Sequence, residues 1–406
     1  MDSSKFLRHY ANWLWSSSTQ VLLVPSWSEQ TLGTALVLFI LADVFLTVLY
    51  ARLGSGLLSY HLARGTWLLF RTLSKPFHSH RPKILSFCGP TILVLVVLVW
   101  ALLLALGMAL IIHPRLGTGV VSTNGPTSRD FVSALYAGGG SMSIIGDTSF
   151  APRSAGFRLL FMLNSLMGVS VISLTLTYLM QVYNALYRRN TFAYSVHLAS
   201  GETADAAELI AGLGPEGQFQ SGYTAVNELA MQMTGLKETH HFYPVLFYFR
   251  FPDTAYAVSR ISLVLLDTVT LIKSALDDQR YGWLKESAPV TQLWRGCLSL
   301  VKDLAETFLG DDLPQGNAPA DSETREEWRR RYYAAVRRLT QAGIPTIADQ
   351  GAGAENYVRL RAEWQSHIAN LAPALGFELR DIDPAGSDPE VPDRRPDFRR
   401  RLHSVS

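Results

Sequence analysis

The chain has 406 residues, of which 48% are hydrophobic and only 17% charged, and its formal net charge is +2. Soluble domains usually carry about 25% charged residues, so the composition argues against a wholly soluble protein. The two cysteines, Cys88 and Cys297, exclude a disulfide framework, and neither has metal-site spacing around it.

Charge divides the chain into two parts. Residues 1–189 hold 14 basic and 5 acidic residues, net +9, whereas residues 190–406 hold 22 basic and 29 acidic residues, net −7. We expect the first part to be a membrane domain and the second a soluble, acidic one.

Three segments of the first part are apolar and long enough to cross a bilayer, which takes about 20 residues. No charged residue occurs from Ile84 to Pro114 or from Leu159 to Tyr187, and residues 30–51 hold only Asp43. The first apolar run begins late and is as long as a span, which argues against a cleaved signal peptide. The sequence predicts an all-α membrane protein. Its expected transmembrane helices are 31–51, 90–112 and 157–182.

Basic residues orient these spans. The linker between the first two spans holds six basic residues and no acid, which places it in the cytoplasm by the positive-inside rule. The second span then runs outward, the loop 113–156 enters from outside, and the third span returns inward to Arg188 and Arg189. The prediction is a multi-pass protein of the cell (inner) membrane, with its N-terminus outside and its C-terminal domain cytoplasmic.

Two segments are expected along the membrane surface. Residues 57–73 are amphipathic and basic, which is typical of an interfacial helix; a short re-entrant or fourth span is the alternative. Residues 1–30 hold Trp13, Trp15 and Trp27, and tryptophan is enriched at membrane interfaces. We therefore expect an N-terminal interfacial segment.

The pattern of the second part of the chain predicts helices that are separated by Gly-, Pro- or acid-rich segments, including 310–321. It contains no Gly-rich βαβ fingerprint, which argues against a nucleotide-binding Rossmann module. Residues 383–406 are rich in proline and charge and are expected to be disordered. The predicted helices are 203–213, 222–236, 254–276, 290–309, 322–342 and 354–373.

Residues 129–152, RDFVSALYAGGGSMSIIGDTSFAP, lie between the second and third spans but are too polar and glycine-rich to form a span. Their sequence predicts a short helix followed by an extended loop. Lipid excludes irregular backbone unless protein shields it or it lines a watery path. The segment therefore predicts a re-entrant pore helix and filter loop.

This arrangement resembles the two-span pore module of the pore-loop, potassium-channel-like cation channels. Their consensus TLTTVGYGDIVP aligns without a gap with SMSIIGDTSFAP at 141–152, and DFVSALYAGG resembles the start of their pore helix. The resemblance covers residues 88–185. It implies a homotetramer in membrane lipid, with K+ and Na+ as permeant cations. We expect no cofactor and no nucleic-acid partner, and a cytoplasmic ligand of unknown identity is left open. The filter residues that it identifies are Ser143, Ile144, Ile145, Gly146, Asp147 and Thr148.

The filter departs from the potassium-selective pattern. Two glycines normally let the backbone aim its carbonyl oxygens at the ion; here Gly146 is kept and Thr148 replaces the second. Ile144 replaces the threonine whose hydroxyl forms the lowest ion site. The filter is instead similar to those of non-selective members. Asp147 would form a ring of four carboxylates at the outer mouth that concentrates cations, or it would cap the loop.

Small and polar residues elsewhere in the membrane part each allow more than one role. Asn164, Gly168 and Thr175 share one helical stripe of the third span, which would face a watery cavity or pack against another helix. Gly138, Gly139 and Gly140 would support a deformable filter or allow close packing. Asp43 would sense protons, pair with a basic residue or lie in a helix contact. The stripe is interpreted as the cavity and gate, and Asp43 as an intramembrane acid.

The second part offers weaker candidates. Glu238, His240 and His241 could bind a metal, but adjacent histidines point in different directions and a structural role is favoured. Arg329–Arg331 are interpreted as a solvated helix face. No nucleophile elbow, HExxH, phosphate loop or CxxC pair occurs, so we do not expect an enzyme.

The expected function is a tetrameric channel for monovalent cations with weak or no potassium selectivity, gated through a cytoplasmic helical domain. The alternatives are a potassium-selective channel and a non-conducting membrane sensor or scaffold with a pore fold. The predicted domains are the interfacial segment 1–30, the first transmembrane helix and basic linker 31–87, the pore module 88–189, the helical regulatory domain 190–382 and the tail 383–406.

Overall fold

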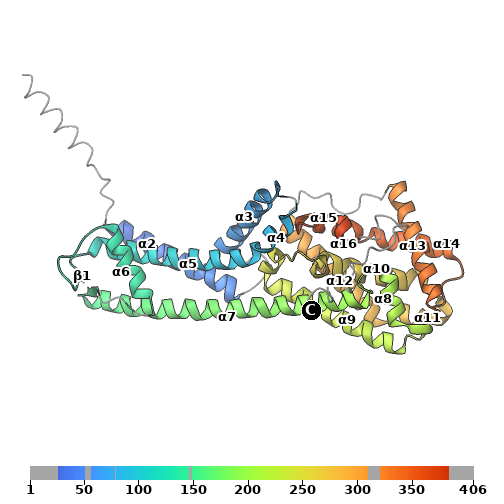
Figure 1. Ribbon diagram of the computed structural model, residues 1–406. Helices are drawn as coiled ribbons and strands as arrows, with labels where there is room; N and C mark the ends of the chain where they lie inside the picture. The colour runs from blue at the N-terminus through green and yellow to red at the C-terminus, as the bar shows by residue number, and fades with distance from the viewer. Residues whose placement is uncertain are drawn as a thin grey trace, which may run out of the picture. The chain divides into compact units, whose positions relative to one another are not determined.

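A computed structural model describes residues 26–50, 56–77, 79–144, 146, 149–309 and 321–383. The described chain is mostly helical and divides into two compact units. The described part of the first unit lies within 26–50, Gly56–Ser59 and Val94–Tyr178, and that of the second within Tyr60–Leu93 and 179–383. Two long helices contribute residues to both units (Figure 1).

Four helices and a small two-stranded antiparallel sheet supply most of the first unit. Its elements are α2 (Ser26–Val44), a π-helical turn (Phe45–Leu49), α5 (Cys88–Ile112), a 3-10 helix (His113–Arg115), β1 (Val120–Ser122), α6 (Phe131–Met142), β2 (Phe150–Pro152) and α7 (Ala155–Ala199).

Three helical stretches are long and apolar enough to cross a membrane, and the three predicted spans fall on them. The stretches are Trp27–Leu49, Arg81–Arg115 and Ala155–Ala199. At 1.5 Å per residue α7 is about 68 Å long, roughly twice the thickness of a hydrocarbon core. It therefore continues well past the predicted end at residue 182. The helix α2 includes the end of the predicted N-terminal segment, whereas residues 1–25, with Trp13 and Trp15, lie outside the described residues.

Glycines bring α2 and α5 close together in the first unit. A Cβ atom built on Gly33 would lie 2.5 Å from the carbonyl oxygen of Gly107, and one built on Gly107 would lie 2.7 Å from Val37 Cγ2. Small residues let helices approach closely without a hydrophobic driving force, as required between helices in lipid.

The strands β1 and β2 were not predicted from the sequence. They pair antiparallel with Val120 opposite Pro152 and Ser122 opposite Phe150. Three-residue strands show too little alternation to be detected. The pairing ties the segment before α6 to the segment after the predicted filter.

The other described elements are helices joined by turns and loops, and all of their residues except Leu58 and Ser59 lie in the second unit. These elements are α3 (Leu58–Leu73), α4 (Arg81–Ser86), α8 (Ala206–Leu213), a 3-10 helix (Pro215–Gly217), α9 (Gln220–Phe242), 3-10 helices (Pro244–Tyr248 and Thr254–Tyr256), α10 (Val258–Ala275), α11 (Asp278–Lys285), α12 (Ala288–Leu309), α13 (Ser322–Gln341), α14 (Gln350–Ala362), α15 (Gln365–Ala374) and α16 (Leu379–Ile382).

The predicted helices of this part agree with the structure in position but not always in extent. The predicted helix 254–276 is a 3-10 turn followed by α10, and 354–373 is two helices, α14 and α15, because the chain breaks at Trp364. Short helices such as α4, α11 and α16 were missed. Aspartate caps fix several starts: side chains of Asp205, Asp277, Asp321 and Asp349 accept hydrogen bonds from the first turns of α8, α11, α13 and α14.

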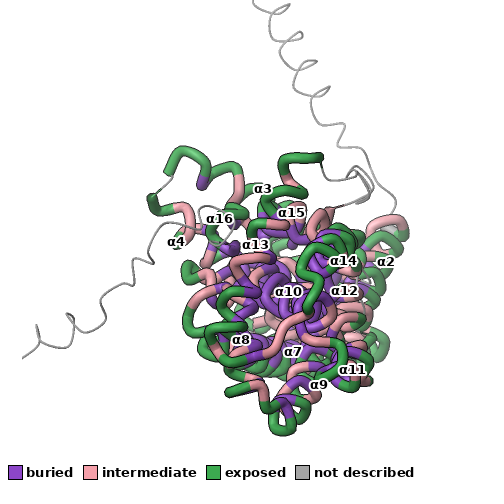
Figure 2. The backbone as a smooth tube through the Cα atoms, turned by 90° about the vertical axis from the view of Figure 1, so that its right-hand side faces the viewer, coloured by how far each residue is buried: buried purple, intermediate pink, exposed green. Residues whose placement is uncertain are grey.

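The helix α10 is the core of the second unit. All of its residues except Arg260 and Lys273 are buried, and it packs against α8, α12, α13, α14 and α15. Figure 2 shows it purple among these helices. A helix that is buried on nearly all sides must satisfy its polar groups within the protein, and the hydroxyls of Thr268, Thr270 and Ser274 bond to carbonyls one turn back.

The basic linker belongs largely to the second unit rather than forming a domain with the first span. The Trp67 ring of α3 lies 6.0 Å from that of Tyr248, and Arg250 Nη1 donates to the carbonyl of Pro82 at 3.1 Å. The predicted interfacial helix 57–73 coincides with α3, which exposes Leu68, Leu69 and Leu73. Its place at a membrane surface stays a prediction.

Four charged side chains form a buried cluster, and two of them were predicted wrongly from the sequence. Arg361 bonds Asp267 at 2.9 Å and Asp383 at 3.1 Å. Arg331 bonds the same two carboxylates at 2.9 and 2.5 Å. Arg331 was assigned to a solvated face, but the helical period of α13 turns it inward. Asp383, assigned to a disordered tail, is 6% exposed. Residues 384–406 lie outside the described residues.

We predict that Asp383→Asn lowers the free energy of unfolding by about 3 kcal/mol, because two buried guanidinium groups would lose a shared counter-charge. Burial opposes ionisation of Asp383, but the charges of Arg331 and Arg361 outweigh it and hold the pKa of this carboxyl below its usual range. Its contribution is therefore present above the unfolded-state pKa of about 3.9 and is lost as pH falls through the lower folded-state pKa.

Thermal unfolding of the full chain in detergent would measure this effect. Glu327→Gln is the matched control, because Glu327 is exposed on α13, the helix that carries Arg331. Equal melting temperatures for the wild type and Asp383→Asn at neutral pH would contradict the assignment.

Candidate functional site

The predicted pore helix corresponds to α6, whose start is fixed by Asp130. The Asp130 carboxylate accepts hydrogen bonds from the backbone N–H of Ser133 at 2.7 Å and from the hydroxyls of Ser128 and Ser133. The bonds from Ser128 and from the Ser133 backbone lower the pKa of Asp130. An aspartate at the N-cap satisfies an N–H group that the helix leaves free.

The glycine run near the end of α6 brings this helix against α5. A Cβ atom built on Gly138 would lie 3.0 Å from the backbone N of Ala109 and 3.2 Å from the carbonyl oxygen of Ala105. The structure thus favours close packing at Gly138, one of the two alternatives left open. Gly139 is less constrained, since its nearest contact would be Ala105 Cβ at 3.7 Å.

Two of the three predicted cavity residues hold the C-terminal end of α6. Asn164 Nδ2 donates to the carbonyl of Gly138 at 3.1 Å and to Ser141 Oγ at 2.5 Å. A Cβ atom on Gly168 would overlap the carbonyl oxygen of Met142. Asn164 is fully buried. These contacts favour helix packing for Asn164 and Gly168 over exposure to a cavity.

The depth of this contact follows from helix geometry. Gly168 lies about 20 Å along α7 from its first residue, Ala155, at 1.5 Å per residue. The last residue of α6, Met142, therefore lies beside the interior of a span-length helix rather than beside its end. Thr175, the third predicted cavity residue, is 5% exposed and also lies on the buried face of α7.

The structure describes three of the six predicted filter residues. Ser143 ends α6 with an extended backbone, and Ile144 is 70% exposed. Gly146 has φ +75° and its N–H donates to the carbonyl of Ser143 at 3.1 Å. This left-handed conformation accounts for a glycine at that position. Ile145, Asp147 and Thr148 lie outside the described residues.

The side of α7 away from α6 carries a polar stripe that was not recognised in the sequence. Its residues are exposed and recur every three or four positions, so they share one face of the helix. The first follows Gly168 by two residues, and the stripe continues toward the C-terminal part of α7. The stripe consists of Ser170, Ser173, Thr177, Gln181 and Asn184.

The exposed faces of the other two membrane-length helices carry no such stripe. Exposed residues of α5 from Val94 to Leu102 are valine, leucine and alanine, and those of α2 from Ala35 to Val44 are alanine, leucine and phenylalanine. Ser and Thr residues are scattered along this apolar helix, and the sequence does not say which of them are exposed. The sequence alone therefore did not distinguish the exposed stripe from the buried residues Asn164 and Thr175.

Asp43 caps a helix in the first unit instead of forming an ion pair. Its carboxylate accepts from the backbone N–H of Leu58 at 2.7 Å, the hydroxyl of Ser59 at 2.5 Å and Trp100 Nε1 at 2.7 Å. Asp43 is completely buried. These three donors are neutral, and no basic residue of the described chain pairs with Asp43. Of the roles considered from the sequence, the geometry therefore supports a place in a helix contact.

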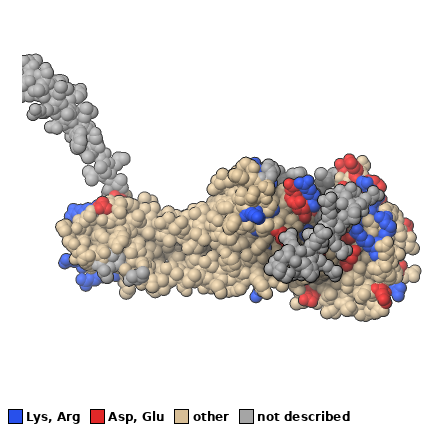
Figure 3. Space-filling view, in the orientation of Figure 1, with Lys and Arg blue, Asp and Glu red and all other residues tan. Residues whose placement is uncertain are grey.

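Charged side chains of the first unit gather at one end of it, and the rest of the face drawn in Figure 3 is uncharged. Charged residues that are confined to one end suit a membrane-spanning unit, because a charge is costly in the hydrocarbon core. Apart from buried Asp43, the described charged residues of this unit are Glu29, Arg115, Arg129, Asp130, Arg153 and Arg158.

The histidines of α9 do not assemble a metal site. Within the described residues no group of three His, Cys, Asp or Glu side chains is placed to hold a metal ion. His240 is 3% exposed, whereas its neighbour His241 is half-buried.

We predict that Gly168→Ala destabilises the protein by about 1–3 kcal/mol, because the added methyl group overlaps a backbone carbonyl of α6 and forces the helices apart. Gly156→Ala is the matched control: Gly156 lies on the same helix, and a Cβ atom built on it would meet nothing within 4 Å. Thermal unfolding in detergent should show a loss for Gly168→Ala alone; equal melting temperatures for both variants would refute the contact.

Comparisons with known proteins give one relative. The chain is 23% identical over 309 residues to YdjJ of Bacillus subtilis (strain 168), described as an uncharacterized membrane protein; the match covers 76% of this chain and 83% of the Bacillus protein. No model of a known protein family matches the chain, and no solved structure matches it. With three helices apolar enough to cross a bilayer, this similarity makes the chain a mostly helical, membrane-associated protein.

Proposed function

We propose that this chain is one subunit of a tetrameric cation channel with weak or no potassium selectivity. In this proposal α5 and α7 cross the inner membrane, α6 and the residues after it form the re-entrant pore loop, and ions pass the loop before reaching a cavity along α7. The four-fold assembly and the permeant K+ and Na+ come from the resemblance of residues 141–152 to pore-loop channels.

The position of α6 supports this proposal. Its C-terminal end lies against Gly168, in the interior of α7, and against Ala105 and Ala109 of α5. An irregular backbone follows directly at Ser143, and lipid tolerates such backbone only where protein shields it or water reaches it. A pore loop meets that condition, because it is shielded by helices on one side and faces water on the other.

The polar stripe on α7 is the observation that carries the proposal. Ser170 to Asn184 place five polar side chains on an exposed face of a helix that has no charge from Leu159 to Tyr187. The exposed faces of α2 and α5 suit lipid, whereas this face suits water. It also begins just beyond Gly168, where a cavity below a filter would begin.

The distribution of charged residues suggests how the proposed channel is oriented in the membrane and which ions it prefers. The linker after the first span holds six basic residues and no acid, whereas the loop 113–158 holds four basic residues and two acids. The linker side is therefore proposed as cytoplasmic. Because the loop is itself net basic, cation preference would depend on Asp147 and on the carbonyl groups around Gly146.

The second unit is proposed as a cytoplasmic regulatory domain that acts through α7. This helix is continuous from Ala155 to Ala199. Near its C-terminal end Arg189 donates to the carbonyls of Leu246 and Phe249, both at 2.9 Å. A rearrangement of residues 244–251 would therefore pull on the helix that carries the polar stripe.

The first test combines cation flux with cysteine labelling. Purified protein in liposomes should pass monovalent cations. A positively charged, water-soluble thiol reagent should label Ser173→Cys and Thr177→Cys and reduce the flux by at least about tenfold, since a positive charge in a pore repels cations. Native Cys88 and Cys297 are fully buried, so background labelling should be low.

Leu102→Cys on α5 is the control, because it is 58% exposed but lies on an apolar face. It should resist the reagent if that face contacts lipid. Absence of cation flux under all tested ligands, pH values and tensions would count against a channel and favour the non-conducting sensor. Flux that Ser173→Cys labelling leaves unchanged would reject the stripe as the ion path.

The second test separates the non-selective channel from the potassium-selective alternative. Asp147→Asn should weaken block by external divalent cations several-fold while reversal potentials stay close for K+ and Na+, because a ring of carboxylates attracts divalent ions. Asp130→Asn removes a carboxylate from the same loop yet keeps a good helix cap, so it should leave the block unchanged. A reversal potential that follows K+ alone would establish the selective alternative.

A further inference from the structure

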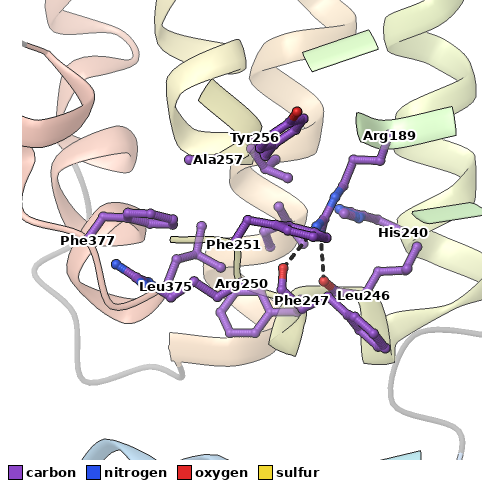
Figure 4. Close-up of a pocket in the computed structure, with 13 residues that line it drawn as sticks. Arg189, His240, Leu246, Phe247, Arg250, Phe251, Tyr256, Ala257, Leu375 and Phe377 are labelled. Carbon is purple, nitrogen blue, oxygen red and sulfur yellow. Dashed lines mark hydrogen bonds between the residues drawn. The ribbon is translucent and has the colours of Figure 1, made fainter. Parts of the chain in front are cut away.

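A small cavity lies in the second unit beside the C-terminal part of α7. Its volume is about 10 Å³, room for about one water-sized particle. Figure 4 shows the Arg189 guanidinium and the His240 imidazole side by side at this cavity, with the Phe251 ring next to them. Among the described residues, the cavity is lined by three basic side chains, Arg189, His240 and Arg250, and by no carboxylate.

Arg189 is a buried cation without a counter-charge in the described chain. It is 3% exposed, and its two terminal nitrogens donate to the carbonyls of Leu246 and Phe249 (dashed lines in Figure 4). Its Nε–H has no partner. The ring of Phe251 lies 5.8 Å away. Carbonyl dipoles and a ring face offset part of the cost of burying a guanidinium, but they do not neutralise it.

His240 is the second unsatisfied group. It is 3% exposed, and neither ring nitrogen has a hydrogen-bond partner. Burial, with a contribution from the Arg189 charge, lowers the pKa of His240 to about 3, so the imidazole is neutral at pH 7 and still offers one N–H donor. A buried polar side chain with both nitrogens unpaired is rare in folded proteins.

Arg250 adds a further positive charge. Burial lowers the pKa of Arg250 to about 10, so it stays protonated at neutral pH. One of its terminal nitrogens donates to Pro82, its guanidinium lies 4.2 Å from the centre of the Phe377 ring, and its Nε has no partner. The cavity therefore has unpaired N–H donors on two sides and a positive potential.

We propose that this cavity binds a small monovalent anion of halide size, which accepts hydrogen bonds from Arg189 Nε and His240. A single water molecule could satisfy the N–H donors but not the charge of Arg189. A metal cation would be repelled by the two guanidinium groups. Phosphate and sulfate are too large for the volume. By contrast, the buried arginines of the Asp267 cluster have two carboxylates of their own and leave no place for an anion.

The experiment measures anion-dependent stability of the full chain in detergent and requires no ion flux. Replacing gluconate by chloride or bromide at constant ionic strength should raise the melting temperature by a few degrees and saturate, because ligand that binds only the folded state stabilises it. His240→Leu should abolish this dependence. His241→Gln, a change at the neighbouring histidine that does not line the cavity, should retain it.

A second variant and a direct measurement cover the case in which His240→Leu does not fold. Ala257→Val adds two methyl groups to the cavity lining and keeps both N–H donors; it should weaken the halide effect at least about fivefold. Crystals grown with bromide should show anomalous density between Arg189 and His240. A melting temperature that is indifferent to halide, an effect retained in His240→Leu, or water alone at this position would overturn the proposal.

Discussion

A helix that ends among apolar helices leaves its last carbonyl groups without water, and this constraint organises the first unit. Asn164 holds the last turns of α6 against α7 by donating to the carbonyl of Gly138 and to Ser141 Oγ. Gly168 gives the carbonyl of Met142 the space that a side chain would occupy. Beyond the candidate filter, the carbonyl of Ser149 accepts a hydrogen bond from the N–H of Thr123 at 2.9 Å, next to the paired strands β1 and β2. The geometry of the candidate pore loop therefore depends on two residues of α7.

Buried charged side chains have three kinds of hydrogen-bond partner in the described residues. Asp43 is solvated by neutral donors from a helix start and an indole. Arg331 and Arg361 share two aspartates, so their cluster is balanced within itself. Arg189 has carbonyl groups and no carboxylate. Arg250, which is also buried, bonds a backbone carbonyl and no carboxylate, so two guanidinium groups at this cavity have no paired counter-charge within the described chain.

The sequence revealed those features that depend on local composition. Spans were located because charge is absent from them, and the start of α6 because DFVSALYAGG resembles the start of a pore helix. The sequence could not give the partner of a side chain distant along the chain, so Arg331 and Asp383 were assigned to solvent and to a tail. Spacing placed Asn164 and Gly168 on one stripe correctly, but spacing does not say what that stripe faces. The exposed stripe from Ser170 became distinct only when burial of the opposite face was known.

The length of α7 connects the contacts of Asn164 with those of Arg189. Asn164 and Arg189 are about 38 Å apart along the helix at 1.5 Å per residue, and each is held by carbonyl groups of another segment. A continuous helix is stiff over this distance, because every turn between them is hydrogen-bonded. In the proposed channel, a rearrangement of residues 244–251 would act on α7 at Arg189, and no loop interrupts the helix between that point and the contacts of Asn164 with α6. If an anion beside His240 neutralises Arg189, as proposed, it would change how firmly that end of α7 is held, and the proposed channel would then respond to occupancy of the cavity through this one helix.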